Sequence, residues 1–356
     1  LKPLHDEAAV RPMRVSLALC TCKSAAFAAY VRRESYTPSE FFSKWTFFTG
    51  PDPTHGFVQY VDQAVAESAG LLAVSADRVV IGSDAQGGAP RRSVRLASKA
   101  NYDQGLFIID LEHIPTGCGT WPAFWMLGED QAHPWPKWGE YDIVEGYHTN
   151  TRVMTTLHST RDCNQRSRTG LDVRNASGAW ATGSNGVPAD NCYVHAADEF
   201  RNQGCSQIGP ESSLGPAFNA GGGGTYAADW DPAARRIRTW FWPRHHEPPD
   251  VLAGAPDPGS WGKPYSYYSL SSKLCSPKHF VNMRLLLDLT FCGDLGNPTF
   301  PKSCPQHPMT CQQFVAQHPE EMAEAYWSIR SLHVYRRAAS PVPPAPVAPP
   351  ASPRPP

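Results

Sequence analysis

The feature that most constrains this chain is a series of short apolar runs between residues 31 and 336, each ended by Gly, Pro, Asn or Asp. Such runs are typical of β-strands, and helical periodicity is nearly absent outside a short stretch at 311–317. Many short strands with turn residues between them predict an all-β sandwich or jelly roll. The clearest runs are 105–111, 141–145, 153–158, 236–242 and 285–291.

Composition divides the chain into three parts, with the predicted β domain at 31–336. Residues 1–30 hold an apolar stretch interrupted by Lys23, which predicts either a secretory signal or an unstructured leader. Residues 337–356 are rich in Pro and Ala, so they predict a disordered tail without apolar periodicity. No apolar run reaches the roughly 18 residues of a membrane span, and we expect no membrane partner.

The charge of the chain gives no reason to expect nucleic acid as a partner. Its 356 residues have a formal net charge of −1, so no excess of positive charge attracts phosphates or anionic lipids. The chain also has 11 Trp and 13 Tyr. Most of these rings are expected in the core, but several in an open cleft would stack on the flat apolar faces of sugar rings.

Eight cysteines follow the leader and are spread through loops rich in Gly and Pro. An even number of cysteines without zinc-type spacing predicts disulfides, an oxidising compartment and hence a secreted protein. Two short separations favour local loops, one between Cys192 and Cys205 and one between Cys304 and Cys311.

One strand-like segment, 138–146, carries three acidic side chains. Because side chains alternate along a strand, Glu140 and Asp142 share a face, and Val144 rather than Glu145 would lie beside them. One extra residue in the strand returns Glu145 to the acidic side. The sequence therefore predicts a β-bulge between Asp142 and Glu145.

Retaining glycoside hydrolysis uses such a group of acids. That reaction needs two carboxyls about 5–5.5 Å apart, one as nucleophile and one as acid/base. A neighbouring negative charge and partial burial keep the acid protonated near neutral pH. We assign Glu140 as nucleophile, Glu145 as acid/base and Asp142 as the group that orients the nucleophile. Spacing alone leaves two alternatives open, a calcium site and a strand whose acids face water.

The residues around the acids are consistent with a cleft. Residues 153–158 follow a turn and predict a hairpin with the acidic strand, which brings His158 close to the position opposite Glu140. His158 is either a hydrogen-bond partner of substrate or carboxylate, or a structural histidine. Four Trp lie just upstream of the acids, and we select Trp125 and Trp135 for the cleft.

Several motifs, in order, resemble glycoside hydrolase family 16, in its fungal laminarinase-like branch of endo-1,3(4)-β-glucanases. The central motif is Glu-x-Asp-x-x-Glu at 140–145, with the bulged spacing of laminarinase-type members. The resemblance extends over most of residues 45–335. The motifs are 47–57, 105–108, 118–125, 140–145, 155–158, 215–219, 240–244, 261–262 and 292–294.

The resemblance implies a jelly-roll β-sandwich of two antiparallel sheets with a concave glycan-binding cleft. It implies the same three catalytic residues and makes Trp125, Trp135, His158 and, more loosely, Arg95 glycan contacts. It implies that no cofactor is required, although many relatives bind a structural calcium. Tyr141 replaces a small aliphatic residue of the relatives, a change that we expect at the lip of the cleft.

We therefore predict a secreted, monomeric endo-β-glucanase that hydrolyses β-1,3- or mixed β-1,3/1,4-glucans with retention. Two alternatives belong to other classes. A lectin-like module would bind the glucan without cutting it, although a lectin has no need of clustered carboxylates. A transglycosylase would use a sugar acceptor in place of water. A purely structural wall protein is the least favoured interpretation.

Overall fold

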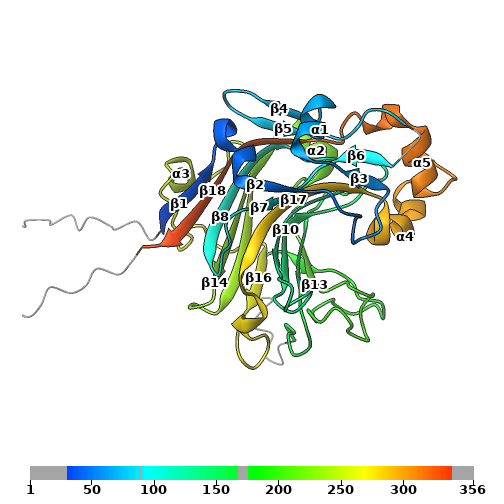
Figure 1. The fold of residues 1–356 in the computed structure, drawn as a ribbon. Helices are drawn as coiled ribbons and strands as arrows, with labels where there is room; N and C mark the ends of the chain where they lie inside the picture. Colours follow the sequence, from blue (N-terminus) through cyan, green and yellow to red (C-terminus); the bar gives the residue numbers. More distant parts are fainter. Residues whose placement is uncertain (1–29, 88–89, 167–174, 339–356) are drawn as a thin grey trace, which may run out of the picture.

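The computed structural model describes residues 30–87, 90–166 and 175–338, which form two large antiparallel sheets (Figure 1). The predicted all-β sandwich is confirmed. The predicted leader, except for Tyr30, and the predicted tail beyond residue 338 lie outside the described residues. Described strands extend one residue past the expected domain at each end, to Tyr30 and Arg337.

The first sheet has the strand order β16-β15-β14-β8-β18-β5-β4, and β1 also pairs with β18. Two of its long strands, β8 and β15, correspond to apolar runs recognised in the sequence. The bounds are β1 Tyr30–Tyr36, β4 Leu72–Val74, β5 Val79–Ile81, β8 Gly105–His113, β14 Gly224–Asp231, β15 Arg236–Pro243, β16 Ser266–Ser269 and β18 Trp327–Arg337.

The second sheet has the order β12-β13-β11-β10-β9-β17-β7-β2, so the acidic strand β10 lies near its centre. A separate parallel pair joins β3 to β6. The bounds are β2 Trp45–Phe48, β3 Val58–Tyr60, β6 Arg91–Ser93, β7 Arg95–Ser98, β9 Thr120–Gly128, β10 Glu140–Glu145, β11 Met154–His158, β12 Ala179–Trp180, β13 Cys205–Ile208 and β17 Met283–Phe291.

The core lies between the two sheets and follows the alternation of side chains along each strand. Phe107 and Ile109 of β8 pack in one buried cluster with Phe124 and Met126 of β9. The opposite face of β9 carries a different cluster, which includes Trp125. The second sheet therefore has a core face and an outer face, and alternate residues of β9 belong to each.

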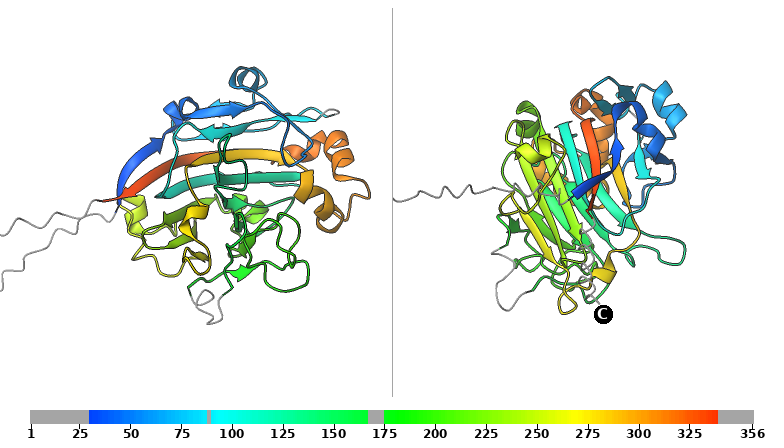
Figure 2. Two further views of the ribbon diagram at one scale, coloured as in Figure 1. Left: turned by 60° about the horizontal axis from the view of Figure 1, so that its bottom comes forward. Right: turned by 90° about the vertical axis from the view of Figure 1, so that its left-hand side faces the viewer.

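Helices lie at the margins of the strand layers, and α4 and α5 (orange) gather at one end of the molecule (Figures 1 and 2). None of the helices in the described residues is long and apolar enough to cross a membrane. The α-helices are α1 Gln63–Ser68, α2 Gly215–Ala220, α3 Pro249–Leu252, α4 Gly293–Ser303 and α5 Cys311–Gln317, and the 3₁₀ turns are η1 Pro38–Glu40, η2 Phe42–Lys44, η3 Pro277–His279 and η4 Pro319–Met322.

The short helix expected at 311–317 is confirmed as α5. Its first turn is fixed by a capping box, in which the Thr310 side chain accepts from the Gln313 backbone N–H and the Gln313 side chain accepts from the Thr310 N–H. Helix α4 was not predicted because it contains Pro298 and Pro301. Disulfide cysteines stand at both of its ends, and they hold a segment with poor helix propensity in place.

All eight cysteines of the described domain form disulfides. The expected pair Cys192–Cys205 is confirmed, but the expected pair Cys304–Cys311 is wrong. Cys304 bonds to Cys118, and Cys311 bonds to Cys292. These two bonds fasten α4 and α5 to strand ends instead of closing a local loop. Cys163 and Cys275 form the fourth bond.

The disulfides allow a test of the chain-entropy account of stability. Replacing both Cys192 and Cys205 by Ala opens a bond across 13 residues, and replacing both Cys118 and Cys304 opens one across 186. We expect the free energy of unfolding to fall by about 3 kcal/mol for the first double variant and about 5 kcal/mol for the second. Denaturant unfolding without reductant measures both losses, and a larger loss for the short loop would contradict the account.

Candidate active site

A β-bulge shapes the acidic strand β10. Its pairing with β11 shifts between Asp142 and Glu145, where the sequence predicted the bulge. Ile143 and Val144 are both buried in the central core, so two successive side chains point inward. Glu140, Asp142 and Glu145 are thereby left together on the outer face of the second sheet, which we call the acidic face.

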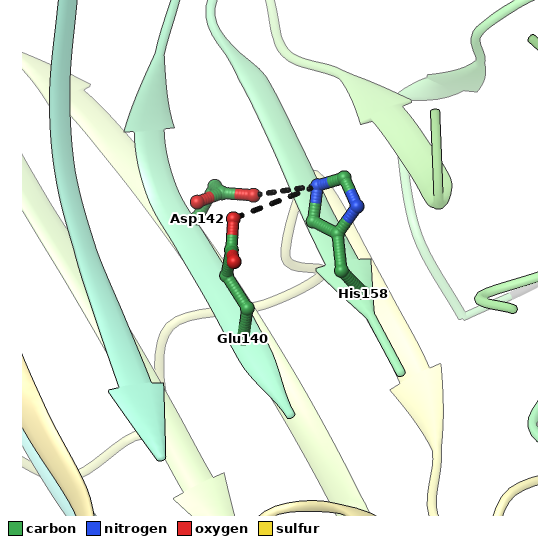
Figure 3. Close-up of side chains that lie close together, drawn as sticks. All are labelled: Glu140, Asp142 and His158. Atoms are coloured by element: carbon green, nitrogen blue, oxygen red, sulfur yellow. Dashed lines mark ion pairs between the residues drawn. The ribbon is translucent and has the colours of Figure 1, made fainter. Parts of the chain in front are cut away.

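The predicted hairpin is also confirmed, and it sets His158 of β11 directly opposite Glu140. The imidazole points toward the carboxylates of Glu140 and Asp142 (Figure 3). His158 Nε2 lies 3.1 Å from Asp142 Oδ2 and 3.9 Å from Glu140 Oε1. One histidine therefore links two of the three acids.

Electrostatics keep this histidine charged. Burial alone would lower the pKa of His158, but the charge of Glu140 and the contact with Asp142 outweigh burial and raise it to about 9. The pKa of the Asp142 carboxyl is also raised well above its usual range, first by burial and then by the charge of Glu140. A single proton held between Asp142 and His158 satisfies both groups.

The two glutamates each receive a hydrogen bond from an indole N–H. Trp135 Nε1 donates to Glu140 Oε2 at 2.5 Å, and Trp121 Nε1 donates to Glu145 Oε1 at 3.0 Å. Burial nevertheless raises the pKa of Glu145, and the charge of Glu140 adds to that shift. Glu145 is thus the glutamate whose surroundings favour the protonated form, while Glu140 has His158 within ion-pair distance.

The remaining predicted contacts lie on the same face. Trp125 of β9 pairs with Asp142 across the sheet, and a row of paired residues runs from Glu145 through Ala123 and Asp288 to Arg95. The Arg95 guanidinium stacks 4.9 Å from the Trp125 ring. All seven residues selected from the sequence are therefore brought to the acidic face.

Two residues of this face were not predicted. Trp121 has the same strand parity as Trp125, so the period of two in β9 would have identified it. Asp288 is the single charged residue in the apolar run 285–291, and an acid inside such a run is itself a signal.

Tyr141 was expected at the lip of a cleft, but it is fully buried and its hydroxyl pairs with Thr239 across the core at 2.6 Å.

Glu140, Asp142 and His158 are also close enough to hold a metal ion, with one ligand atom from each within 4.8 Å of the others. This group does not fit the calcium ion that the sequence resemblance allows, because calcium takes six to eight oxygen ligands and no imidazole. The ion pair between His158 and Asp142 accounts for the close approach without a metal.

A two-sheet jelly roll whose outer face gathers two indole-bonded glutamates, with an aspartate between them on the same strand, is typical of a glycoside hydrolase. Residues 45–335 match the family model described as the XgeA-like, catalytic GH16 domain. The chain belongs to glycoside hydrolase family 16, as the motifs indicated.

Similar proteins agree with this membership. An endo-1,3(4)-β-glucanase of Arthroderma benhamiae is 36% identical, over 89% of this chain and 67% of that protein. Laminarinase 16A of Phanerochaete chrysosporium, solved with 6-O-glucosyl-laminaritriose in donor and acceptor sites, has a TM-score of 0.75 at 33% identity, covering 86% of this chain and 99% of that one. An elongating family 16 β-1,3-glucosyltransferase has a TM-score of 0.75 at 34% identity, covering 86% of this chain and 100% of that one.

The pKa of His158 provides a test of the charge arrangement. The value of about 9 lies above the roughly 6.5 of an unfolded chain, so the stabilisation by its partners is complete below about pH 6.5 and is lost as pH rises through about 9. An NMR titration of the imidazole should give a midpoint near 9 that falls in Asp142→Asn. A wild-type midpoint below about 6.5 would contradict this arrangement.

Proposed function

We propose that this protein is a retaining endo-β-glucanase that hydrolyses β-1,3- or mixed β-1,3/1,4-glucans by double displacement. The observation that carries the proposal is the bulge of β10, which leaves Glu140 and Glu145 on one face with different surroundings. Two carboxyls of unlike protonation on one face are what retaining hydrolysis requires.

In the first step, a Glu140 oxygen attacks the anomeric carbon and the glycosidic C–O bond breaks. The leaving oxygen takes the proton of Glu145, whose raised pKa keeps that proton available. In the second step, Glu145 accepts a proton from water, and the water oxygen displaces Glu140 from the anomeric carbon. Two inversions restore the original configuration, and neither step needs a cofactor.

Asp142 and His158 serve the nucleophile in this mechanism. The positive charge of His158 and the Trp135 N–H stabilise negative charge on Glu140 before attack. Asp142 holds His158 in place through the 3.1 Å contact. The half-buried Trp135, the ring of Trp125 and the planar guanidinium of Arg95 offer flat surfaces on which a glucan can stack.

Transfer to a sugar acceptor is a second candidate function. The glycosyl-enzyme of the first step can react with a sugar hydroxyl as well as with water, and a similar structure is that of an elongating β-1,3-glucosyltransferase. A lectin-like role is disfavoured because it gives no use to paired carboxyls with unlike surroundings.

We also infer that the protein is secreted and acts as a monomer on extracellular or wall glucan. Four disulfides support an oxidising compartment. The net charge of −1 is compatible with a neutral polysaccharide as partner. A structural calcium stays a proposal that is independent of the acidic face.

Glutamine variants test the two assigned roles. Glu140→Gln should fold normally and lose laminarin hydrolysis by about 10³-fold or more, because an amide cannot form the glycosyl-enzyme. Glu145→Gln should lose laminarin hydrolysis as well, but it should still release the aglycone of a β-glucoside with a highly acidic leaving group in a burst, since that group needs no proton. The matched control is Glu40→Gln, an exposed glutamate outside the acidic face, and near-normal activity of Glu140→Gln would overturn the proposal.

Product analysis separates hydrolysis from transfer. Laminarin, lichenan and a β-1,4-glucan are digested in turn, and NMR reads the anomer of the fresh product. We expect β-anomers from laminarin or lichenan and no cleavage of the β-1,4-glucan. Fresh α-anomers would exclude retention, and products longer than the substrate would establish transfer as the main reaction.

A further inference from the structure

One buried carboxylate of the acidic face has no part in the proposed mechanism. Asp288 lies on β17, and its neighbours across the sheet are Ala123, which in turn pairs with Glu145, and Arg95. Two strand spacings of roughly 4.8 Å separate its backbone from that of Glu145. Its side chain is only 8% exposed, so it belongs to the floor of this face rather than to its rim.

Asp288 contacts the two residues proposed to bind glucan beside the reacting bond. Trp125 Nε1 donates a hydrogen bond to Asp288 Oδ2 at 3.3 Å, and Arg95 Nη1 lies 3.8 Å from the same oxygen. The Arg95 guanidinium is further enclosed by the rings of Trp125 at 4.9 Å and Phe48 at 5.2 Å. One carboxylate oxygen thus fixes an indole and a guanidinium against each other.

We propose that Asp288 is a positioning residue for glucan binding, whose ionised carboxylate holds Trp125 and Arg95 in the orientation that receives the sugar chain. This inference rests on the proposed function and adds a residue that touches neither the substrate nor the reacting atoms. When Asp288 takes up a proton, it stops attracting Arg95, so Arg95 and the indole stacked on it lose their common anchor.

The groups that face Asp288 set the pH at which its carboxyl gains or loses a proton, and that pH is near neutral. Burial, followed by the negative charges of Asp52 and Glu145, raises the pKa of Asp288 to about 7, against the lowering effects of Arg95 and the Trp125 hydrogen bond. Tyr60 of β3 is the other titratable group nearby, and its own pKa is raised, first by burial. Asp288 therefore gains its charge as pH rises through neutrality.

The substitution Asp288→Asn separates positioning from packing. The amide oxygen of the new asparagine can still accept a hydrogen bond from the Trp125 N–H, but the neutral amide cannot attract Arg95 by charge. The variant is expected to fold, because a buried acid with a raised pKa opposes folding at neutral pH and the amide removes that cost. Asp110→Asn is the matched control, since it removes an Asp–Arg pair of the first sheet, 2.6 Å long, away from the acidic face.

The experiment measures the binding of a linear β-1,3-glucan hexasaccharide to the full chain carrying Glu140→Gln, by calorimetry between pH 5.5 and 8.5. Without further change, affinity should rise with pH around 7. Adding Asp288→Asn should weaken binding by about 10-fold at pH 8.5 and by less than about 2-fold at pH 5.5. The dependence of affinity on pH should therefore become flatter. In the otherwise wild-type enzyme the same substitution should raise KM and leave kcat within about 3-fold.

A double-variant cycle completes the test. Adding Asp288→Asn to Arg95→Gln should weaken binding little beyond Arg95→Gln alone, because the guanidinium that Asp288 attracts is then already absent. Additive losses, an unchanged pH profile in Asp288→Asn, or a fall in kcat at constant KM would each overturn the positioning role. Equal affinity with and without Asp288→Asn would remove this inference alone, whereas no binding of the hexasaccharide at any pH would remove the proposed function with it.

Discussion

The bulge in β10 is the constraint on which the rest of the acidic face depends. A regular strand would bury Glu145 in the core between the sheets, where an unpaired carboxylate is costly. Because Ile143 and Val144 are both taken into the core, the next residue returns to the outer face. The hydrophobic core and the acidic face are therefore fixed by the same backbone irregularity.

The charge balance of the face follows from that geometry. Three carboxyls on neighbouring positions would repel each other in low dielectric, so each needs a different partner. His158 faces Asp142 and Glu140, and separate indoles face Glu140 and Glu145. These unequal partners, rather than the residue types alone, distinguish two glutamates that are chemically identical in the sequence.

The local parts of this arrangement could be predicted from the sequence. Strand parity and the Glu-x-Asp-x-x-Glu spacing gave the bulge, and the apolar run at 153–158 gave the hairpin that sets His158 opposite Glu140. Family motifs indicated Trp125 and Arg95. Each of these features depends on contacts within a strand or between consecutive strands, for which spacing along the chain is sufficient information.

Features that depend on distant segments could not be predicted in this way. The bond from Cys118 to Cys304 spans 186 residues, and nothing in the spacing of the cysteines favours it over a local loop. The position of Asp288 beside Arg95 results from β17 pairing with β7, strands that are far apart in the chain. Tyr141 shares the strand parity of Ile143, which places its side chain in the core and not at the lip of a cleft.

The central claim is that Glu140 and Glu145 have divided roles, with Glu140 bonded to the sugar during the reaction. A 2-deoxy-2-fluoro laminaribioside with a dinitrophenolate leaving group should trap that state, because the fluorine slows the second step and the leaving group needs no acid. Peptide mass mapping of the inactivated enzyme is predicted to find the sugar on Glu140. A sugar on any other residue, or inactivation without a covalent adduct, would contradict the account.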